Sequence, residues 1–188
     1  DDGVVLRQSA DRFRAVFAPK LDGAWNLHRL TRPSASITEP LDFFVGYSSI
    51  AALLGSPGQA NYAAANASLD ALVHERRRQG LAASTINWGP WSEVGMAVRT
   101  ARRSATAGPG LVAELPSLAP ADGLRALDDI LAADPPQSAV MAAGWTEFFA
   151  RLGPRTPPLL RDVAARSAGS VSPAAPARTG PRNSGTDC

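Results

Sequence analysis

Three short strand-like segments, separated by helix-like segments, constrain the fold of this chain more than any other feature. Phe43–Tyr47 is a nearly continuous apolar run, and Ala83–Trp88 and Ser138–Ala143 are the second and third strand-like segments. An unbroken short apolar run is typical of a strand that is buried on both faces of a parallel sheet. Strands that alternate with helices indicate such a sheet. We therefore predict an α/β fold with a parallel sheet.

Four segments carry helix signals: Asp11–Thr31, Ser56–Gln79, Pro120–Ala133 and Trp145–Leu152. In the first, apolar residues recur at helical spacing, and Pro19 and Gly23 predict a kink or two abutting helices. In the second, Ser56 is expected to cap the helix, Pro57 to occupy its first position and Gln59 to complete a capping box. Gly80 is expected to close this helix.

The remaining segments are predicted to be irregular. Arg32–Pro40 is polar, contains two prolines and is expected to be a loop. The range 94–118 is expected to be an irregular cover over the sheet. From Gly153 onward, 36 residues include six Pro, four Gly and four Ser, a composition typical of a disordered linker. We therefore divide the chain into a domain at 1–152 and a linker at 153–188.

Charge and cysteine content exclude several classes of function. The formal net charge is +2, and five Arg and two Asp after residue 152 give that stretch +3, so the domain itself carries about −1. A nucleic-acid-binding surface is therefore not indicated, and the run Arg76–Arg78 is expected to be a solvated helix end.

No apolar run is long enough to span a membrane. The one cysteine, Cys188, cannot form an intrachain disulfide, so we expect a cytoplasmic protein.

Three polar residues stand where a parallel sheet binds its ligands. Ser49 follows the first strand, Tyr62 comes thirteen residues later near the start of the next helix, and Asn66 shares a helix face with Tyr62. Ligands of doubly wound sheets bind at the carboxyl ends of the strands. Taken singly, each residue has an ordinary structural interpretation: a strand-end hydrogen bond for Ser49, a core position for Tyr62 and a packed or capping amide for Asn66.

Lysine usage adds a fourth candidate. Of the 19 basic residues, only position 20 is Lys, and the others are Arg. Lys and Arg differ where a compact ammonium is required. Composition alone leaves biased codon usage as an equal explanation for this pattern.

Two segments together resemble the ketoreductase domains of modular polyketide synthases, which belong to the short-chain dehydrogenase/reductase superfamily. They are APKLDGAWNLHRLT at 18–31 and FFVGYSSIAALLGSPGQANYAAANASLDALVHERRRQGLAASTINWGPWSEVGMA at 43–97. The resemblance covers most of residues 1–97 and is loose over 98–152. Arg32–Pro40 is about five residues longer than is typical of the family, which we interpret as a loop insertion.

The resemblance implies catalytic roles for four residues. Tyr62 matches the tyrosine that protonates the ketone oxygen, and Ser49 the serine that hydrogen-bonds it. Lys20 matches the lysine that these ketoreductases carry on the preceding helix, where it assists Tyr62 and contacts the NADPH ribose. Asn66 occupies the position at which other superfamily members carry the lysine. Gly89, Pro90 and Trp91 resemble the contact with the nicotinamide, although a simple strand-stopping turn is an alternative there.

The resemblance also bears on the stereochemistry of the product. Members that form the L-alcohol usually have Trp eight residues before the tyrosine, where this chain has Leu54. Members that form the D-alcohol usually have Pro and Asn at the positions of Pro57 and Asn61, and an upstream Leu-Asp-Asp that Asp1 and Asp2 would end. These matches predict a D-hydroxyacyl product.

One expected motif is absent from the sequence. No G-x-G-x-x-G occurs, and such a dinucleotide fingerprint would precede these motifs in a complete domain. We therefore interpret 1–152 as the C-terminal, catalytic half of a ketoreductase domain. The resemblance then implies the C-terminal half of a Rossmann-like, doubly wound parallel sheet, followed by the disordered linker. We expect the isolated fragment to be inactive.

In a complete domain, the resemblance implies NADPH-dependent reduction of a β-ketoacyl thioester. The substrate would be carried by the phosphopantetheine arm of an acyl carrier protein, with the rest of the synthase polypeptide as the other partner. Two alternatives remain open. A non-catalytic structural segment of a megasynthase is expected to lack the Ser, Tyr and Lys set, and a sugar epimerase or dehydrogenase of the same superfamily is expected to have Lys at position 66.

Overall fold

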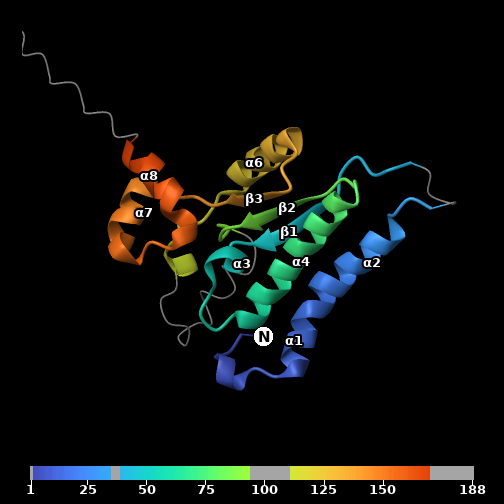
Figure 1. Ribbon diagram of the computed structural model, residues 1–188. Helices are drawn as coiled ribbons and strands as arrows, with labels where there is room; N and C mark the ends of the chain where they lie inside the picture. The colour runs from blue at the N-terminus through green and yellow to red at the C-terminus, as the bar shows by residue number, and fades with distance from the viewer. Residues whose placement is uncertain (1, 35–38, 94–110, 170–188) are drawn as a thin grey trace, which may run out of the picture. The chain divides into compact units, whose positions relative to one another are not determined.

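The computed structural model describes residues 2–34, 39–93 and 111–169. Three strands form a parallel sheet in the order β1-β2-β3: β1 is Val45–Ser49, β2 is Ser84–Trp88 and β3 is Gln137–Val140 (Figure 1). The register pairs Val45 with Ser84 and Thr85 with Gln137. All three strands run in one direction, so their carboxyl ends lie along a single edge. The predicted parallel α/β sheet is confirmed.

The two longer strands differ in how completely they are buried. All five residues of β2 are buried, as expected for a strand covered on both faces. The prediction was wrong for β1, which begins at Val45 and not at Phe43 and leaves Tyr47 50% exposed. Within the described residues β1 pairs only with β2, so its other edge has no neighbouring strand. Phe43 precedes the strand and is 66% exposed.

Helices cover both faces of the sheet, which makes it doubly wound (Figure 1). On one face lies α4 (Ala60–Arg78), so close that a Cβ atom on Gly46 would come within 3.2 Å of Leu69. On the other face lies α6 (Pro120–Ala133), whose Leu127 and Ile130 pack against Ile86 and Trp88. The bounds of α6 are those predicted from the sequence.

The first predicted helix is three consecutive elements that lie alongside α4 (Figure 1). Ser9 caps α1 (Ala10–Phe17) by accepting a hydrogen bond from the Arg12 amide. A π-helical segment, η2 (Ala18–Asp22), follows, and α2 (Gly23–Leu30) completes the set. The amide of Gly23 donates to the carbonyl of Ala18, five residues back, which is the π pattern. The interruption predicted from Pro19 and Gly23 is thus confirmed, with Lys20 at its centre.

The start of α4 differs from the prediction. Ser56–Gln59 forms a turn, closed by a 3.0 Å hydrogen bond from the Gln59 amide to the Ser56 carbonyl, and the helix begins only at Ala60. The Ser56 hydroxyl donates to the Gln59 side-chain oxygen at 2.7 Å and so does not cap the helix. Gly58, with a φ of 75°, allows the turn, because few other residues adopt this conformation. Pro57 therefore lies in the turn and not at the first helical position.

Short helices complete the part up to Ala143: η1 (Val5–Arg7), α3 (Ala51–Leu54) and η3 (Leu111–Glu114). Most of the segment expected to be an irregular cover, 94–110, lies outside the described residues. Among the residues that are described, no helix combines the length and apolarity needed to cross a bilayer.

Residues from Gly144 onward form a separate compact unit. It contains α7 (Trp145–Leu152), as predicted, then η4 (Gly153–Arg155), η5 (Pro158–Leu160) and α8 (Arg161–Gly169). The expectation of a disordered linker from Gly153 was wrong up to Gly169. Leu160 is buried, so apolar residues within the proline-rich stretch do find packing partners. Residues 170–188 lie outside the described part.

Candidate active site

Tyr62 lies in the first turn of α4, beside the carboxyl edge of the sheet. Its side chain is half-buried, and its amide donates a 2.8 Å hydrogen bond to the side-chain oxygen of Asn61. The Tyr62 hydroxyl makes no hydrogen bond to any other described residue. A tyrosine that served only as a core residue would have its hydroxyl satisfied inside the protein. The hydroxyl is instead available to a ligand.

Lys20 faces Tyr62 from the π-helical segment. Its Nζ donates to the carbonyl oxygen of Tyr47 at 2.7 Å and lies 5.9 Å from the centroid of the Tyr62 ring. Burial lowers the pKa of Lys20, and the negative charge of Asp70 opposes that shift. A positive charge near a phenol favours the phenolate and so makes the proton easier to transfer. The structure thus brings together two of the residues selected from the sequence.

Ser49 is the last residue of β1, rather than the residue just past it, and it is buried. Its Oγ accepts a 3.2 Å hydrogen bond from the Ala51 amide, and the Ile50 amide donates to the Trp88 carbonyl at 2.9 Å. These bonds fix the turn that carries the chain from β1 into α3. Because a hydroxyl that accepts one hydrogen bond can still donate its proton, Ser49 keeps a donor for a substrate oxygen.

Asn66 is fully buried one turn below Tyr62. Its Nδ2 donates to the Tyr62 carbonyl at 2.8 Å, and its Oδ1 is buried with no hydrogen-bond partner among the described residues. The face shared with Tyr62, predicted from the spacing, is confirmed by this contact. The contact is to the helix backbone, so it supports the packed interpretation of Asn66.

Sequence reasoning missed a buried polar network behind these residues. Asn87 of β2 lies with its Nδ2 3.0 Å from Ser48 Oγ, 3.2 Å from the Ser49 carbonyl and 2.8 Å from Asp70 Oδ2. Ser48 in turn donates to the Asn66 carbonyl at 3.3 Å. One sequence feature could have indicated this network: Asn87 lies within a strand of otherwise closely packed residues. A buried amide requires hydrogen-bond partners, so such an asparagine predicts polar neighbours.

The three residues expected to contact a nicotinamide lie in the turn after β2. The Gly89 amide donates to the Val140 carbonyl at 2.7 Å, and the Pro90 carbonyl accepts from the Leu118 amide at 2.7 Å. The Trp91 ring lies 4.9 Å from that of Trp88 and covers Gly123 of α6. These contacts give the turn a structural role, which was the alternative to a cofactor contact.

Gly123 is predicted to be essential for the packing of Trp91. A Cβ atom at position 123 would lie 2.3 Å from the indole, so Gly123→Ala should destabilise a complete domain by about 1–3 kcal/mol through overpacking. Once Trp91→Ala has removed the ring, the same change should instead stabilise by roughly 1 kcal/mol, because alanine is the better helix former. Denaturant unfolding of the four proteins measures both effects. Equal signs in the two backgrounds would contradict the packing argument.

Two of the residues assigned to stereocontrol, Asp2 and Pro57, lie at the turn before Tyr62. Both carboxylate oxygens of Asp2 lie 3.2 Å from Gln59 Nε2, and the Gly3 amide donates to the Gly58 carbonyl at 2.7 Å. Pro57 is exposed in the same turn. The structure therefore brings the start of the chain to the residues that immediately precede Tyr62.

The other three assigned residues are placed differently. Leu54 ends α3 and is partly buried, and Asn61 is fully buried, so the Asn61 side chain supports the backbone of Tyr62. Asp1 lies outside the described residues.

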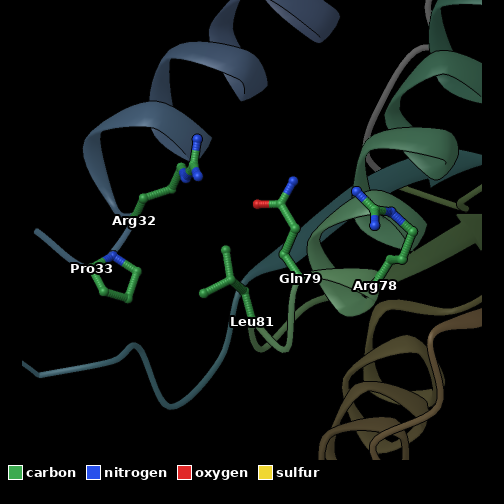
Figure 2. A pocket seen from close by; sticks show the side chains of 5 residues that line it. All are labelled: Arg32, Pro33, Arg78, Gln79 and Leu81. Carbon is green, nitrogen blue, oxygen red and sulfur yellow. The ribbon is translucent and has the colours of Figure 1, made fainter.

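A groove of about 570 Å³ lies far from these residues, at the other end of α4 (Figure 2). Figure 2 shows Arg32 and Pro33 on one side and the helix-end residues Arg78 and Gln79 on the other, with Leu81 between them. Gln79 follows Tyr62 by seventeen positions, a rise of roughly 25 Å along a helix. This groove contains none of the residues selected from the sequence.

Arg76 lies at the same end of α4 and is buried, so the prediction of a solvated helix end was wrong for this residue. It is only 1% exposed and lies over the Phe44 ring, 4.0 Å from its centroid. Its Nη1 is 3.2 Å from His28 Nδ1 and donates to Thr31 Oγ1 at 3.2 Å. Burial lowers the pKa of His28, and the positive charge of Arg76 lowers it further. Arg76 therefore joins α4 to α2 and to the segment just before β1 inside the protein.

The described residues fit the nicotinamide–ribose end of a nicotinamide cofactor. The Lys20 ammonium has three N–H groups and uses one on Tyr47, so two remain for the hydroxyls of a ribose. Tyr62 presents its hydroxyl beside this position. The pyrophosphate end would require backbone amides of a glycine-rich loop, and the sequence contains no such loop.

Comparisons with known proteins bear on the family of this chain. Residues 1–93 match the family described as the KR domain. A phenolphthiocerol/phthiocerol polyketide synthase polypeptide of Mycobacterium tuberculosis (strain CDC 1551 / Oshkosh) is 47% identical over 134 residues, which are 71% of this chain and 6% of that protein. The spectinabilin polyketide synthase system protein NorB of Streptomyces orinoci is 41% identical over 190 residues, covering 93% of this chain and 8% of that protein.

Solved structures show the same likeness. One described as an A-type ketoreductase from a modular polyketide synthase has a TM-score of 0.73 at 34% identity, over 91% of this chain and 34% of that one. The first ketoreductase of the tylosin synthase has a TM-score of 0.70 at 33% identity, over 92% of this chain and 36% of that one. This chain thus spans about a third of these ketoreductases and 6–8% of the synthases. Sequence, fold and likeness agree that the chain belongs to the ketoreductase domain family of polyketide synthases, with the Rossmann-like fold of short-chain dehydrogenases/reductases.

Proposed function

We propose that this chain is the catalytic part of an NADPH-dependent ketoreductase that converts a β-ketoacyl thioester into a β-hydroxyacyl thioester. One observation carries the proposal. The Lys20 ammonium lies against the ring of a tyrosine whose hydroxyl makes no hydrogen bond within the described part of the chain. This pair stands beside the carboxyl edge of a parallel sheet, where doubly wound folds bind their ligands.

Each residue has a separate task in this proposal. Bound NADPH would supply the hydride. Ser49 donates a hydrogen bond to the ketone oxygen and stabilises the negative charge that develops there. Tyr62 transfers its proton to the same oxygen, and the positive charge of Lys20 facilitates that transfer by favouring the phenolate. Lys20 also binds the ribose of the cofactor with the N–H groups that Tyr47 leaves unused.

The proposed partners follow from the same chemistry. The substrate is a thioester on the phosphopantetheine arm of an acyl carrier protein, and the rest of the synthase polypeptide supplies the dinucleotide-binding segment. Several curated relatives are named polyketide synthases or parts of such systems, which supports this context. The alternative of a sugar epimerase or dehydrogenase is disfavoured because position 66 is Asn and its side chain bonds the helix backbone.

The proposal predicts a D-configured product. In a complete domain, meaning this chain preceded by a dinucleotide-binding segment, NADPH and a β-ketoacyl thioester should yield mainly the D-3-hydroxyacyl thioester. The hydride is delivered from a fixed nicotinamide, so the product's configuration depends on the side from which the thioester arm enters. A Trp at position 54 would fill one entrance to the site with its indole, and Leu54 leaves that entrance open. Chiral chromatography of the product measures the outcome.

A variant at the same position provides the control. Leu54→Trp should lower the fraction of D product while NADPH is still consumed. A predominantly L product from the unaltered domain would overturn the stereochemical assignment. Absence of any ketone reduction would overturn the proposed function itself and favour a structural segment of the synthase.

A further inference from the structure

Asp70 is a buried acidic residue that the proposed reaction does not use. It lies two turns below Tyr62 on α4, eight residues on, so Tyr62, Asn66 and Asp70 share one helix face. Asp70 is 6% exposed. Its Oδ2 accepts from Asn87 Nδ2 at 2.8 Å, and its Oδ1 is buried with no hydrogen-bond partner among the described residues. A buried carboxylate oxygen without a partner is costly and calls for an explanation.

The hydrogen bonds of Asp70 lead directly to the candidate site. Asn87, which Asp70 holds, also lies within hydrogen-bond distance of Ser48 Oγ and of the Ser49 carbonyl. Ser48 donates to the carbonyl of Asn66. These contacts fasten the ends of β1 and β2 to the part of α4 that carries Tyr62. Asp70 thus lies at the base of a network that fixes Ser49 relative to Tyr62.

We infer, building on the proposed function, that Asp70 is a positioning residue for the Lys20–Tyr62 pair. It acts through its hydrogen bond, which orients Asn87 and the end of β1, and through its negative charge, which lies on the helix face that Asp70 shares with Tyr62. Partial burial lowers the pKa of Lys20, and the Asp70 charge is what opposes that effect. Without it, Lys20 would lose its proton at a lower pH and could no longer assist Tyr62.

The other titratable groups near this region lie on α4 and on the elements packed against it. Besides Lys20, η2 contributes Asp22, whose side chain is exposed. α3 (Ala51–Leu54) and β2 (Ser84–Trp88) contain no titratable side chain. The other titratable groups on these packed elements are Tyr47 of β1, His28 and Arg29 of α2, and Asp11, Arg12 and Arg14 of α1. The Tyr47 ring lies 5.6 Å from that of Trp88, Arg76 holds His28, and Arg29 is exposed. Asp11 pairs with Arg14, and Arg12 donates to the carbonyls of Asp2 and Arg7. On α4 itself, His74 bonds Gln137 and Glu75 pairs with Arg78.

The negative charge of Asp70 determines the direction in which its removal shifts the pH profile. Asp70→Asn keeps the size of the side chain and an oxygen for Asn87 but removes the negative charge. Loss of that charge lowers the pKa of Lys20. The ammonium that assists Tyr62 is then lost at a lower pH. The alkaline limb of kcat/KM for reduction should therefore move to lower pH, by on the order of one unit.

The test uses the complete domain and two variants, Asp70→Asn and Ser48→Ala. Ser48→Ala disturbs the same network without changing a charge, so it should lower the rate but leave the alkaline limb in place. A second measurement does not depend on activity: mass spectrometry follows the acetylation of the Lys20 amine by acetic anhydride as a function of pH. Asp70→Asn should allow acetylation of Lys20 at lower pH, and Ser48→Ala should not.

The outcomes separate this inference from the proposed function. If the complete domain reduces no ketone, the proposed function fails, and the acetylation profile still tests the link between Asp70 and Lys20. If Asp70→Asn leaves the Lys20 profile unchanged, or if Ser48→Ala shifts it equally, Asp70 has only a structural role and the inference is overturned. A shift specific to Asp70→Asn supports it.

Discussion

Tyr62→Phe in a complete domain should lower kcat for ketone reduction by on the order of a hundredfold or more, because one positioned proton donor contributes at least that much. The ring would remain, so the contact with Lys20, 5.9 Å from its centroid, should persist. The Tyr62 hydroxyl makes no hydrogen bond to another described residue, so its removal should not destabilise the fold. Stopped-flow measurement of NADPH oxidation gives the rate, and thermal unfolding reports the stability.

Tyr47→Phe provides a matched control for this variant. Tyr47 contributes only its backbone carbonyl to Lys20, and its side chain is 50% exposed. Removal of its hydroxyl should therefore leave kcat nearly unchanged. Full activity of Tyr62→Phe would remove Tyr62 from the proposed mechanism, and equal losses in both variants would point to a general effect of lost hydroxyl groups.

The 188-residue chain on its own is expected to bind NADPH far more weakly than the complete domain and to reduce no ketone. Its sequence has no G-x-G-x-x-G loop to hold the pyrophosphate. Each hydrogen bond to a charged group contributes about 1.5–3 kcal/mol, so the loss of two should weaken binding on the order of a hundredfold or more. Within the described residues β1 has a free edge, which also favours aggregation.

Isothermal titration of NADPH into both proteins tests this expectation. A complete domain with a bulky residue in place of a fingerprint glycine should behave like the shorter chain, which would assign the loss to the phosphate loop. Micromolar binding with turnover by the 188-residue chain would show that its own residues suffice, and the expectation would then be wrong.

Much of the fold could be predicted from the sequence because local signals and tertiary packing agree. The bounds of α6 and α7 match the predictions, since each helix has a clear start and stop. The π-helical break was signalled by Pro19 and Gly23. The start of α4 was misplaced because Ser56 bonds the side chain of Gln59 rather than a helix amide, a choice that the sequence leaves open.

The candidate site was predictable only in part. Lys20 and Tyr62 were selected from different segments, and the structure brings them together. The burial of Arg76 depends on Phe44 and His28, which are distant in sequence, so the local pattern of three arginines was misleading. The contact between Trp91 and Gly123 likewise joins segments that no local pattern connects.

The π-helical segment that carries Lys20 has an evolutionary consequence. Such a segment behaves as one extra residue accommodated within a helix, so its gain or loss leaves the preceding and following turns on their original faces. Here α1 and α2 can keep their packing against α4 while the residues between them are displaced. The direction of the lysine could thus have been altered by a single insertion or deletion between Ala18 and Asp22. A new arrangement of the site could arise in this way without a new hydrophobic core.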